Sequence, residues 1–376
     1  MTPMTRRSLL GGAASITAGG VLAGPAAAVA APRRAHDRVE FHGRHQAGIL
    51  TPVQRHMAFA AFDVTLGDAN SLRELLRAWS SAAALMTAGQ PAGDAGTRPE
   101  EAPRDTGEAV GLTPARLTVT FGVAPELFDG RFGLAARRPA ALRPLEALPG
   151  EALEPARTGG DLCVQACADD RQVAFHTLRE LAHIATGAAR MRWMQTGFAS
   201  PRNLMGFKDG TNNLDVRDRD AMRRHVWVGR EETQPWMRGG TYLVARRVRI
   251  LVEEWDRSHL DEQQEVIGRA KLSGDVLAEA PTSAHIRLAA PSANDGIALL
   301  RRGYSFGDGT VGGGDAMLDA GLFFVAFTRA PSRFAAIQRR LGASDALNEY
   351  IRHEGGGLFA VPGGARPGGF VFDGLI

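Results

Sequence analysis

The feature that most constrains the fold is a strand-then-helix unit that occurs once in each half of the chain. Residues 161–181 begin with an apolar run and continue with hydrophobic residues at helical spacing, and residues 321–341 follow the same plan. Both halves run roughly strand, helix, insertion, strand, strand, helix. Hairpin-like strands with crossover helices predict an α+β fold of two ferredoxin-like domains, each an antiparallel sheet with helices on one face. The repeat alone establishes only duplication.

The hydrophobic pattern also places the individual elements. Apolar runs predict strands at 57–64, 116–122, 161–168, 189–198, 240–252, 297–305, 321–328 and 357–361. Helical spacing predicts helices at 70–79, 170–186, 258–268 and 331–341. Asn70 or Ser71 is the expected cap of the first helix, and residues 88–113, rich in Gly, Pro and Ala, predict a long loop. We expect a targeting segment and two domains, at 1–31, 45–200 and 201–376.

The N-terminus is typical of a targeting segment. Arg6 and Arg7 directly precede an apolar, Gly- and Ala-rich run that ends in small residues suited to cleavage. This pattern resembles a twin-arginine export signal, although Thr5, Leu9 and Gly11 depart from its usual form. An ordinary secretory signal is the alternative. The run is too short for a stable membrane span, so we expect a protein exported by the twin-arginine machinery to an extracellular or periplasmic location.

Composition argues against a nucleic-acid-binding protein. The 44 basic residues nearly balance the 41 acidic ones, and no basic run with interleaved aromatics follows Arg34, so nucleic acid is not an expected partner. Cys163 and Cys167 lie four apart on one predicted strand, roughly 13 Å from each other, which is too far for a disulfide. We interpret them as small buried hydrophobes, with a thiolate ligand or redox pair as the minor alternative.

Three segments carry residue types that are common in active sites. Asp209 lies in a Gly- and Asn-rich stretch, Gly206-Phe207-Lys208-Asp209-Gly210-Thr211, although Asp-Gly alone is a common turn pair. His285 follows in Ser283-Ala284-His285-Ile286-Arg287-Leu288-Ala289, and Arg301 in Leu300-Arg301-Arg302-Gly303-Tyr304-Ser305. Each of these residues by itself is more often structural or exposed than functional.

Taken together, the three segments resemble the dye-decolorizing peroxidases, a family of haem b enzymes. They match the family patterns G-x-x-D-G-T, S-H-I-R-L-A-N-P and L-R-R-G-Y-S, and the resemblance runs from about residue 41 to 363. Ala284 and Ala290 depart from the second pattern. Gly303 places the chain with the exported branch, which is similar to the deferrochelatase/peroxidase of iron-uptake operons.

The resemblance implies a role for each site residue. His285 is the expected axial iron ligand of haem b, Asp209 the residue that moves a proton of hydrogen peroxide, and Arg301 a fixed positive charge beside it. The haem site is expected in the second domain, and the fold is expected to be of the dimeric α+β barrel type. Further candidates are the haem-edge residues Gly210, Thr211 and Asn212, the partners of the second His285 nitrogen Asp319 and Glu349, and the pocket wall Phe323, Phe324 or Phe327.

The implied function is a haem b peroxidase that reduces hydrogen peroxide and oxidises dyes, phenols or other small one-electron donors. A carboxylate base predicts an acidic pH optimum. The alternatives are a deferrochelatase that releases iron from haem and a haem-binding protein without turnover. Trp and Tyr residues are candidate radical relays, but packing is the better interpretation of each, and His353 is expected at the surface. A homo-oligomer is left open.

Overall fold

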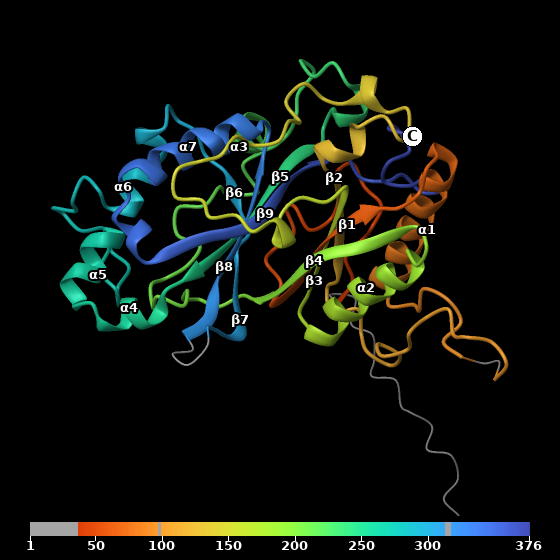
Figure 1. Ribbon diagram of the computed structural model, residues 1–376, viewed down its shortest axis with the longest axis horizontal. Coiled ribbons are helices and arrows are strands. Elements are labelled where there is room, and N and C mark those ends of the chain that lie inside the picture. The colour runs from red at the N-terminus through yellow and green to blue at the C-terminus, as the bar shows by residue number, and fades with distance from the viewer. Residues whose placement is uncertain (1–36, 97–98, 313–316) are drawn as a thin grey trace, which may run out of the picture. The chain divides into compact units, whose positions relative to one another are not determined.

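The computed structural model describes residues 37–96, 99–312 and 317–376, which all belong to one compact unit. The expected export signal at 1–31 lies outside these residues. Figure 1 shows a central array of strands with α1 and α2 at one end of the molecule and α4 to α7 at the other.

The first half forms a four-stranded antiparallel sheet in the order β2-β3-β1-β4. Its elements are β1 His56–Val64, α1 Ala69–Thr87, β2 Thr118–Val123, β3 Leu162–Ala168, α2 Arg171–Ile184 and β4 Ala189–Phe198. Asp68 caps α1 by accepting from the backbone N–H groups of Asn70 and Ser71, so the prediction of either of those residues as the cap was wrong by two or three residues.

The second half repeats this arrangement in the order β9-β5-β8-β7, and the short β6 pairs with the same edge of β8 as β7 does. Its strands are β5 Thr241–Ile250, β6 Leu300–Arg301, β7 Tyr304–Val311, β8 Met317–Thr328 and β9 Ile351–Val361. Its helices are α4 Val252–Arg257, α5 Leu260–Ile267, α6 His285–Ala289 and α7 Pro331–Ser344, while α3 Arg219–His225 connects the halves. Short 3-10 helices lie at η2 Pro125–Phe128, η3 Ala135–Arg137, η4 Pro155–Arg157, η5 Pro235–Met237, η6 Pro291–Ala293 and η7 Ala346–Glu349.

The two sheets close into a single barrel through two short contacts between their edges. Val123 of β2 pairs with Ala360 of β9, and Phe198 of β4 pairs with Ser305 of β7. Phe59 lies in the interior, where its ring centroid is 5.2 Å from that of Phe323. The predicted α+β fold of duplicated ferredoxin-like domains, of the barrel type, is confirmed.

Strand alternation separates this interior from the outer, helix-covered face. Cys163 and Cys167 point inward, are fully buried and form no disulfide, as predicted. Burial raises the pKa of both thiols, which makes them unreactive at neutral pH. On the outer face of the sheet, Trp79 of α1 and Leu178 of α2 belong to a second hydrophobic core between the helices and the strands.

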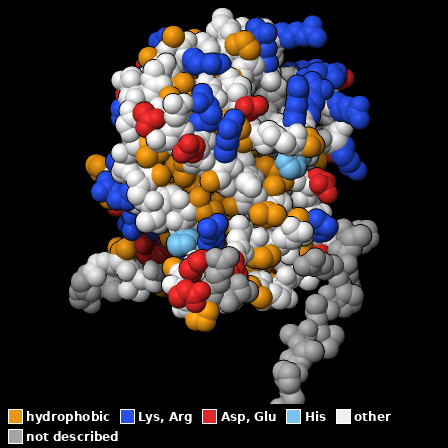
Figure 2. All heavy atoms as spheres, turned by 90° about the vertical axis from the view of Figure 1, so that its right-hand side faces the viewer, with side chains coloured by type: hydrophobic (Ala, Val, Ile, Leu, Met, Phe, Trp, Pro, Cys, Tyr) orange, Lys and Arg blue, Asp and Glu red, His pale blue; other side chains and the backbone are white. Residues whose placement is uncertain are grey.

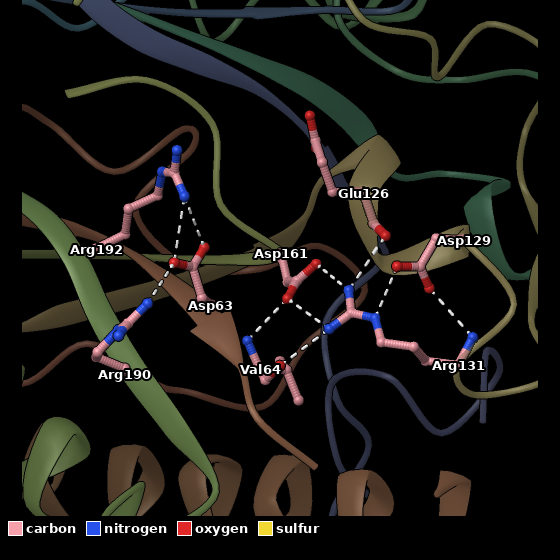
Figure 3. Close-up of polar contacts among 8 residues, drawn as sticks. All are labelled: Asp63, Val64, Glu126, Asp129, Arg131, Asp161, Arg190 and Arg192. Atoms are coloured by element: carbon pink, nitrogen blue, oxygen red, sulfur yellow. Dashed lines mark hydrogen bonds and ion pairs between the residues drawn. The ribbon is translucent and has the colours of Figure 1, made fainter. Parts of the chain in front are cut away.

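A polar cluster fastens the ends of β1 and β3, as Figure 3 shows. Asp161 is buried and accepts from the backbone N–H of Val64 at 2.8 Å. The Arg131 guanidinium donates to Asp161 Oδ1 at 2.6 Å and to the carbonyl of Val64 at 2.9 Å. Beside this cluster, Asp63 pairs with Arg192 at 3.2 Å on a more exposed surface.

Several predictions differ from the structure. The expected strand at 297–305 is broken between β6 and β7, and the helices α3, α4 and α6 were not predicted. His353 lies buried in β9 and not at the surface, so that prediction was wrong. The described residues of 88–113 form neither helix nor strand, as expected.

None of the helices in the described part of the chain combines the length and hydropathy needed to cross a bilayer. Figure 2 views the end that carries α1 and α2, and hydrophobic side chains gather in the middle of this face while Lys and Arg concentrate toward its upper edge. Phe175 of α2 is among the exposed large hydrophobic residues.

Candidate functional site

The loop that carries Asp209 is held in shape by its own hydrogen bonds. The Asn203 side-chain oxygen accepts from the backbone N–H groups of Met205 and Phe207, each at 3.1 Å. The backbone N–H of Asp209 donates to the carbonyl of Pro201 at 3.0 Å. Phe207 is buried, whereas Asp209 is exposed. The loop therefore presents a solvent-accessible carboxylate from a fixed backbone.

Arg301, the last residue of β6, is tied directly to the residues after Asp209. Its Nη2 donates to the carbonyl of Thr211 at 2.7 Å and to that of Asn212 at 3.3 Å. Asn213 exchanges side-chain hydrogen bonds with the backbone N–H and C=O of Arg301, at 3.0 and 2.9 Å. Gly210 and Asn212 adopt φ angles of 68° and 55°, a left-handed backbone that Gly and Asn tolerate best. The structure thus brings Gly210, Thr211 and Asn212 together with Arg301.

The electrostatic setting of Arg301 reflects its burial. Burial lowers the pKa of its guanidinium from the ordinary value, the Asp209 carboxylate opposes this effect, and Arg269 adds to it. A guanidinium starts from so high a pKa that it stays protonated throughout the range in which the protein is folded. Arg301 is therefore a desolvated, permanent positive charge within electrostatic reach of Asp209.

His285 begins the short helix α6 and is oriented by a buried carboxylate. Its Nδ1 lies 2.6 Å from Asp345 Oδ2, and the other oxygen of Asp345 accepts from the backbone N–H of Leu347 at 2.9 Å. With a carboxylate as acceptor, Nδ1 carries the proton and Nε2 presents its lone pair. The His285 side chain is 31% exposed, so this lone pair is accessible to a ligand.

Asp345 was missed by the sequence analysis, which named Asp319 and Glu349 instead. Asp319 is buried in an ion pair with Arg247 at 2.7 Å, and Glu349 is exposed. Asp345 does carry a sequence signal, because it caps the 3-10 helix η7. That signal marks the start of a helix but does not indicate contact with a residue 60 positions away.

Arg301 faces the outer side of the barrel. Leu300 points into the interior core, so Arg301 and its partner Ala326 on β8 share the outer face with Phe324. Phe323 and Phe327 point inward and are fully buried. Phe324 is thus the one of the three candidate phenylalanines that faces the helix layer. It is only half-buried and packs against Phe334 of α7.

Comparison with known proteins identifies the family. Models of the N-terminal and C-terminal parts of the Dyp-type peroxidases match residues 46–199 and 200–366, which together make up most of the chain. The chain belongs to the Dyp-type peroxidase family. As a member, it is a haem-dependent peroxidase.

Individual members of the family cover nearly the whole chain. Deferrochelatase from Escherichia coli (strain K12) is 36% identical over 366 residues, which span 88% of this chain and 86% of the relative. Ferric DtpA from Streptomyces lividans is 39% identical, with a TM-score of 0.82 and coverage of 93% and 98% of the two chains. A DyP-type peroxidase from Streptomyces coelicolor is 40% identical, with a TM-score of 0.81 and coverage of 89% and 95%.

The residues of this Dyp-type peroxidase fit its haem cofactor. One side of the site is an outward sheet face on which Leu322 and Phe324 are half-buried, whereas the other residues of β8 from 319 to 328 are buried, as expected where a planar apolar group packs. On the helix side, His285 presents an accessible Nε2 backed by Asp345, an arrangement typical of metal-binding imidazoles. Arg301 adds a charged group on the sheet side.

The aromatic candidates for a radical relay are all buried. This set comprises Trp79, Trp193, Trp227, Trp236, Trp255, Tyr242, Tyr304 and Tyr350, which are all the Trp and Tyr residues of the chain. Burial raises the pKa of the Tyr304 and Tyr242 hydroxyls above the ordinary value. Packing is therefore their evident role, as the sequence interpretation favoured.

Proposed function

We propose that Asp209 and Arg301 together activate hydrogen peroxide beside a haem b bound by His285. The observation that carries this proposal is the set of hydrogen bonds that fixes the 209–213 loop to Arg301. These bonds hold the half-buried Arg301 against the loop that carries the exposed Asp209, and activation of peroxide needs both a base and a positive charge. Dyes, phenols and other small one-electron donors are the proposed reducing substrates.

The two side chains divide the work of cleaving the O–O bond. When bound, haem supplies the iron at which peroxide is reduced. The Asp209 carboxylate accepts a proton from one peroxide oxygen and returns it to the other, which leaves as water. The Arg301 guanidinium stabilises the negative charge that develops on the departing oxygen. Because the base is a carboxylate, which ordinarily titrates near pH 4, peroxidase activity should be highest in acid.

Replacement of each residue by Ala tests this assignment. We expect Asp209→Ala to slow the reaction with peroxide roughly 10²- to 10⁴-fold and Arg301→Ala roughly 10²- to 10³-fold, with haem retained. The measurement is stopped-flow absorbance of the holoprotein mixed with peroxide. Asp215 and Arg217 form an exposed Asp–Arg pair in the following segment, so Asp215→Ala and Arg217→Ala are matched controls that should react normally. Unchanged peroxide kinetics in Asp209→Ala and Arg301→Ala would refute both roles.

A deferrochelatase activity is the second candidate, favoured by the 36% identity to the Escherichia coli deferrochelatase. It would use the same site, so product analysis distinguishes the two. Release of iron with intact protoporphyrin in the absence of dye oxidation would support the second activity. Oxidised dye without free protoporphyrin would support the first.

We also propose export through the twin-arginine machinery, on the strength of Arg6 and Arg7 before an apolar run. That route carries folded proteins, which suits a chain whose cofactor is inserted before export. Replacing both arginines with lysine should keep the protein in the cytoplasm, as cell fractionation would show. Continued export of the double variant would favour an ordinary secretory signal.

A further inference from the structure

A second constellation of metal-ligand residues lies far from the haem site. Asp105, His176 and Glu180 are 1%, 4% and 0% exposed, and their ligand atoms all lie within 4.8 Å of one another. His176 and Glu180 are four residues apart on α2, so they share one face of the helix. Figure 1 places α2 at the opposite end of the molecule from α6 and α7.

The third residue, Asp105, comes from the long loop at 88–113 and is rigidly held. Its Oδ2 accepts from the backbone N–H of Ala92 at 2.7 Å and its Oδ1 from that of Gly107 at 2.8 Å. The neighbouring Thr106 N–H donates to Glu180 Oε2 at 2.9 Å. The described part of the loop has no helix or strand, and the bond between Thr106 and Glu180 ties it to α2.

The imidazole of His176 is oriented like that of a metal ligand. Its Nδ1 lies 3.3 Å from Glu108 Oε2 and 3.3 Å from Thr106 Oγ1. Its Nε2 faces Asp105 Oδ2 at 3.8 Å, which is too long for a hydrogen bond. Two ligands of one tetrahedral ion, each about 2.1 Å from it, lie about 3.4 Å apart. The gap between His176 and Asp105 therefore suits a shared cation better than a direct bond.

Glu180 supplies a further indication that the cluster binds a cation. The residue is fully buried, yet its Oε1 has no hydrogen-bond partner among the described residues. An unpaired carboxylate oxygen in the interior costs the protein free energy unless a proton, water or cation compensates it. Because Glu180 belongs to the constellation, a cation placed there would provide that compensation.

The charge balance of the cluster also favours a divalent ion. Asp105, Glu108 and Glu180 bring three carboxylates, and Arg179 contributes one positive charge next to Glu108 at 3.1 Å. With an uncharged imidazole, as metal ligation requires, these formal charges leave the cluster two negative charges in excess, which one divalent cation would neutralise.

We propose that Asp105, His176 and Glu180 bind one divalent transition-metal ion of the Zn²⁺ or Mn²⁺ type, which fastens the 88–113 loop to α2. One imidazole and two carboxylates are a donor set that these ions accept, whereas Ca²⁺ and Mg²⁺ prefer oxygen ligands alone. The carboxylate of Glu108 orients the imidazole from its other nitrogen. The site is independent of peroxide chemistry and serves the stability of the loop.

Metal analysis of the haem-loaded protein tests the proposal. The full chain is treated with a chelator, incubated with Zn²⁺ or Mn²⁺ and desalted. Its metal content per chain is then measured by inductively coupled plasma mass spectrometry. We expect one equivalent of Zn²⁺ or Mn²⁺ besides the haem iron in the wild type, and loss of that ion in His176→Gln and Glu180→Gln. His183→Gln, an exposed residue on the same helix, and Glu100→Gln, an exposed residue of the same loop, should both retain it.

Protection of the loop provides a second measurement. Zn²⁺ or Mn²⁺ should raise the melting temperature of the wild type and slow tryptic cleavage after Arg104, and it should do neither in His176→Gln. The Soret absorbance should be the same in all variants, which separates this site from the haem site. Wild-type protein that binds neither ion, prefers Ca²⁺ to both, or binds as much metal as His176→Gln would overturn the proposal.

Discussion

At the scale of single residues, the function of His285 depends on Asp345. The two oxygens of this buried carboxylate serve two donors, His285 Nδ1 and the Leu347 N–H. An amide has only one acceptor oxygen, so Asp345→Asn must turn its NH₂ group toward one of them. We expect haem to bind roughly 10- to 100-fold more weakly in Asp345→Asn, because the imidazole loses the partner that fixes its tautomer.

Haem transfer to an acceptor protein measures this loss, and resonance Raman spectroscopy measures the iron–imidazole stretch. The stretch should move to lower frequency in Asp345→Asn, an effect that simple loosening of the fold would not produce. Glu349→Gln is the matched control, because Glu349 is a nearby acidic residue on the surface. Equal haem affinity and an unshifted stretch in Asp345→Asn would show that Asp345 does not orient His285.

A second residue, His353, should make stability depend on pH. Burial, with the nearby charge of Arg246, lowers its pKa to about 4. As pH falls below the ordinary value of 6.5, the unfolded chain takes up a proton that the folded one refuses, so stability declines down to about pH 4. The loss is about 3 kcal/mol. His353→Gln should lose correspondingly less between pH 7 and 4.5 in urea unfolding, whereas the exposed His183→Gln should behave as wild type.

At the scale of elements, the cluster in Figure 3 predicts which ion pairs hold the strands. Asp161→Ala would leave the buried N–H of Val64 without its acceptor and Arg131 without its main partner, at a cost of about 1–3 kcal/mol. Asp63→Ala removes a carboxylate from the same region but only from partly exposed pairs, so it should cost less than about 1 kcal/mol. Denaturant midpoints measure both, and equal losses would contradict the distinction.

Sequence patterns located the long elements well, because their periodicity survives in any packing. β4 at Ala189–Phe198 was predicted at both ends, and α2 begins after its Asp170 cap. The five-residue helix α6 shows too little periodicity to be recognised. His353 was misplaced because its side chain is covered by tertiary packing, with Gln338 of α7 3.4 Å from its Nε2, and no local pattern encodes that contact.

The residues of the candidate site also divide into those that the sequence located and those that it did not. Asp209, His285 and Arg301 were chosen through a family resemblance, and the structure places Arg301 with the loop after Asp209. The contact between His285 and Asp345 depends on how α6 packs against α7, so no spacing in the sequence predicts it. Residues that act through tertiary contacts are recovered only when the fold is known.

At the scale of the whole molecule, duplication has produced two halves that share one core. The sheets touch at their edges through single residue pairs, yet the barrel interior is continuous between them. Phe59 from the first half lies against Phe323 and Phe359 from the second, with ring centroids 5.2 and 6.0 Å away. Neither sheet buries its inner face without the other, so the halves should be stable only together.

Phe59→Ala tests this interdependence. Truncating an interior ring should cost about 3–5 kcal/mol, and the loss should appear in both halves because they open together. Native-state hydrogen exchange of the slowest amides in β3 and β8 measures each half separately, and both should lose equal protection. The exposed Phe175→Ala on α2 is the control and should change little. If Phe59→Ala weakens β3 while β8 keeps its full protection, the two halves are independent folding units that merely touch.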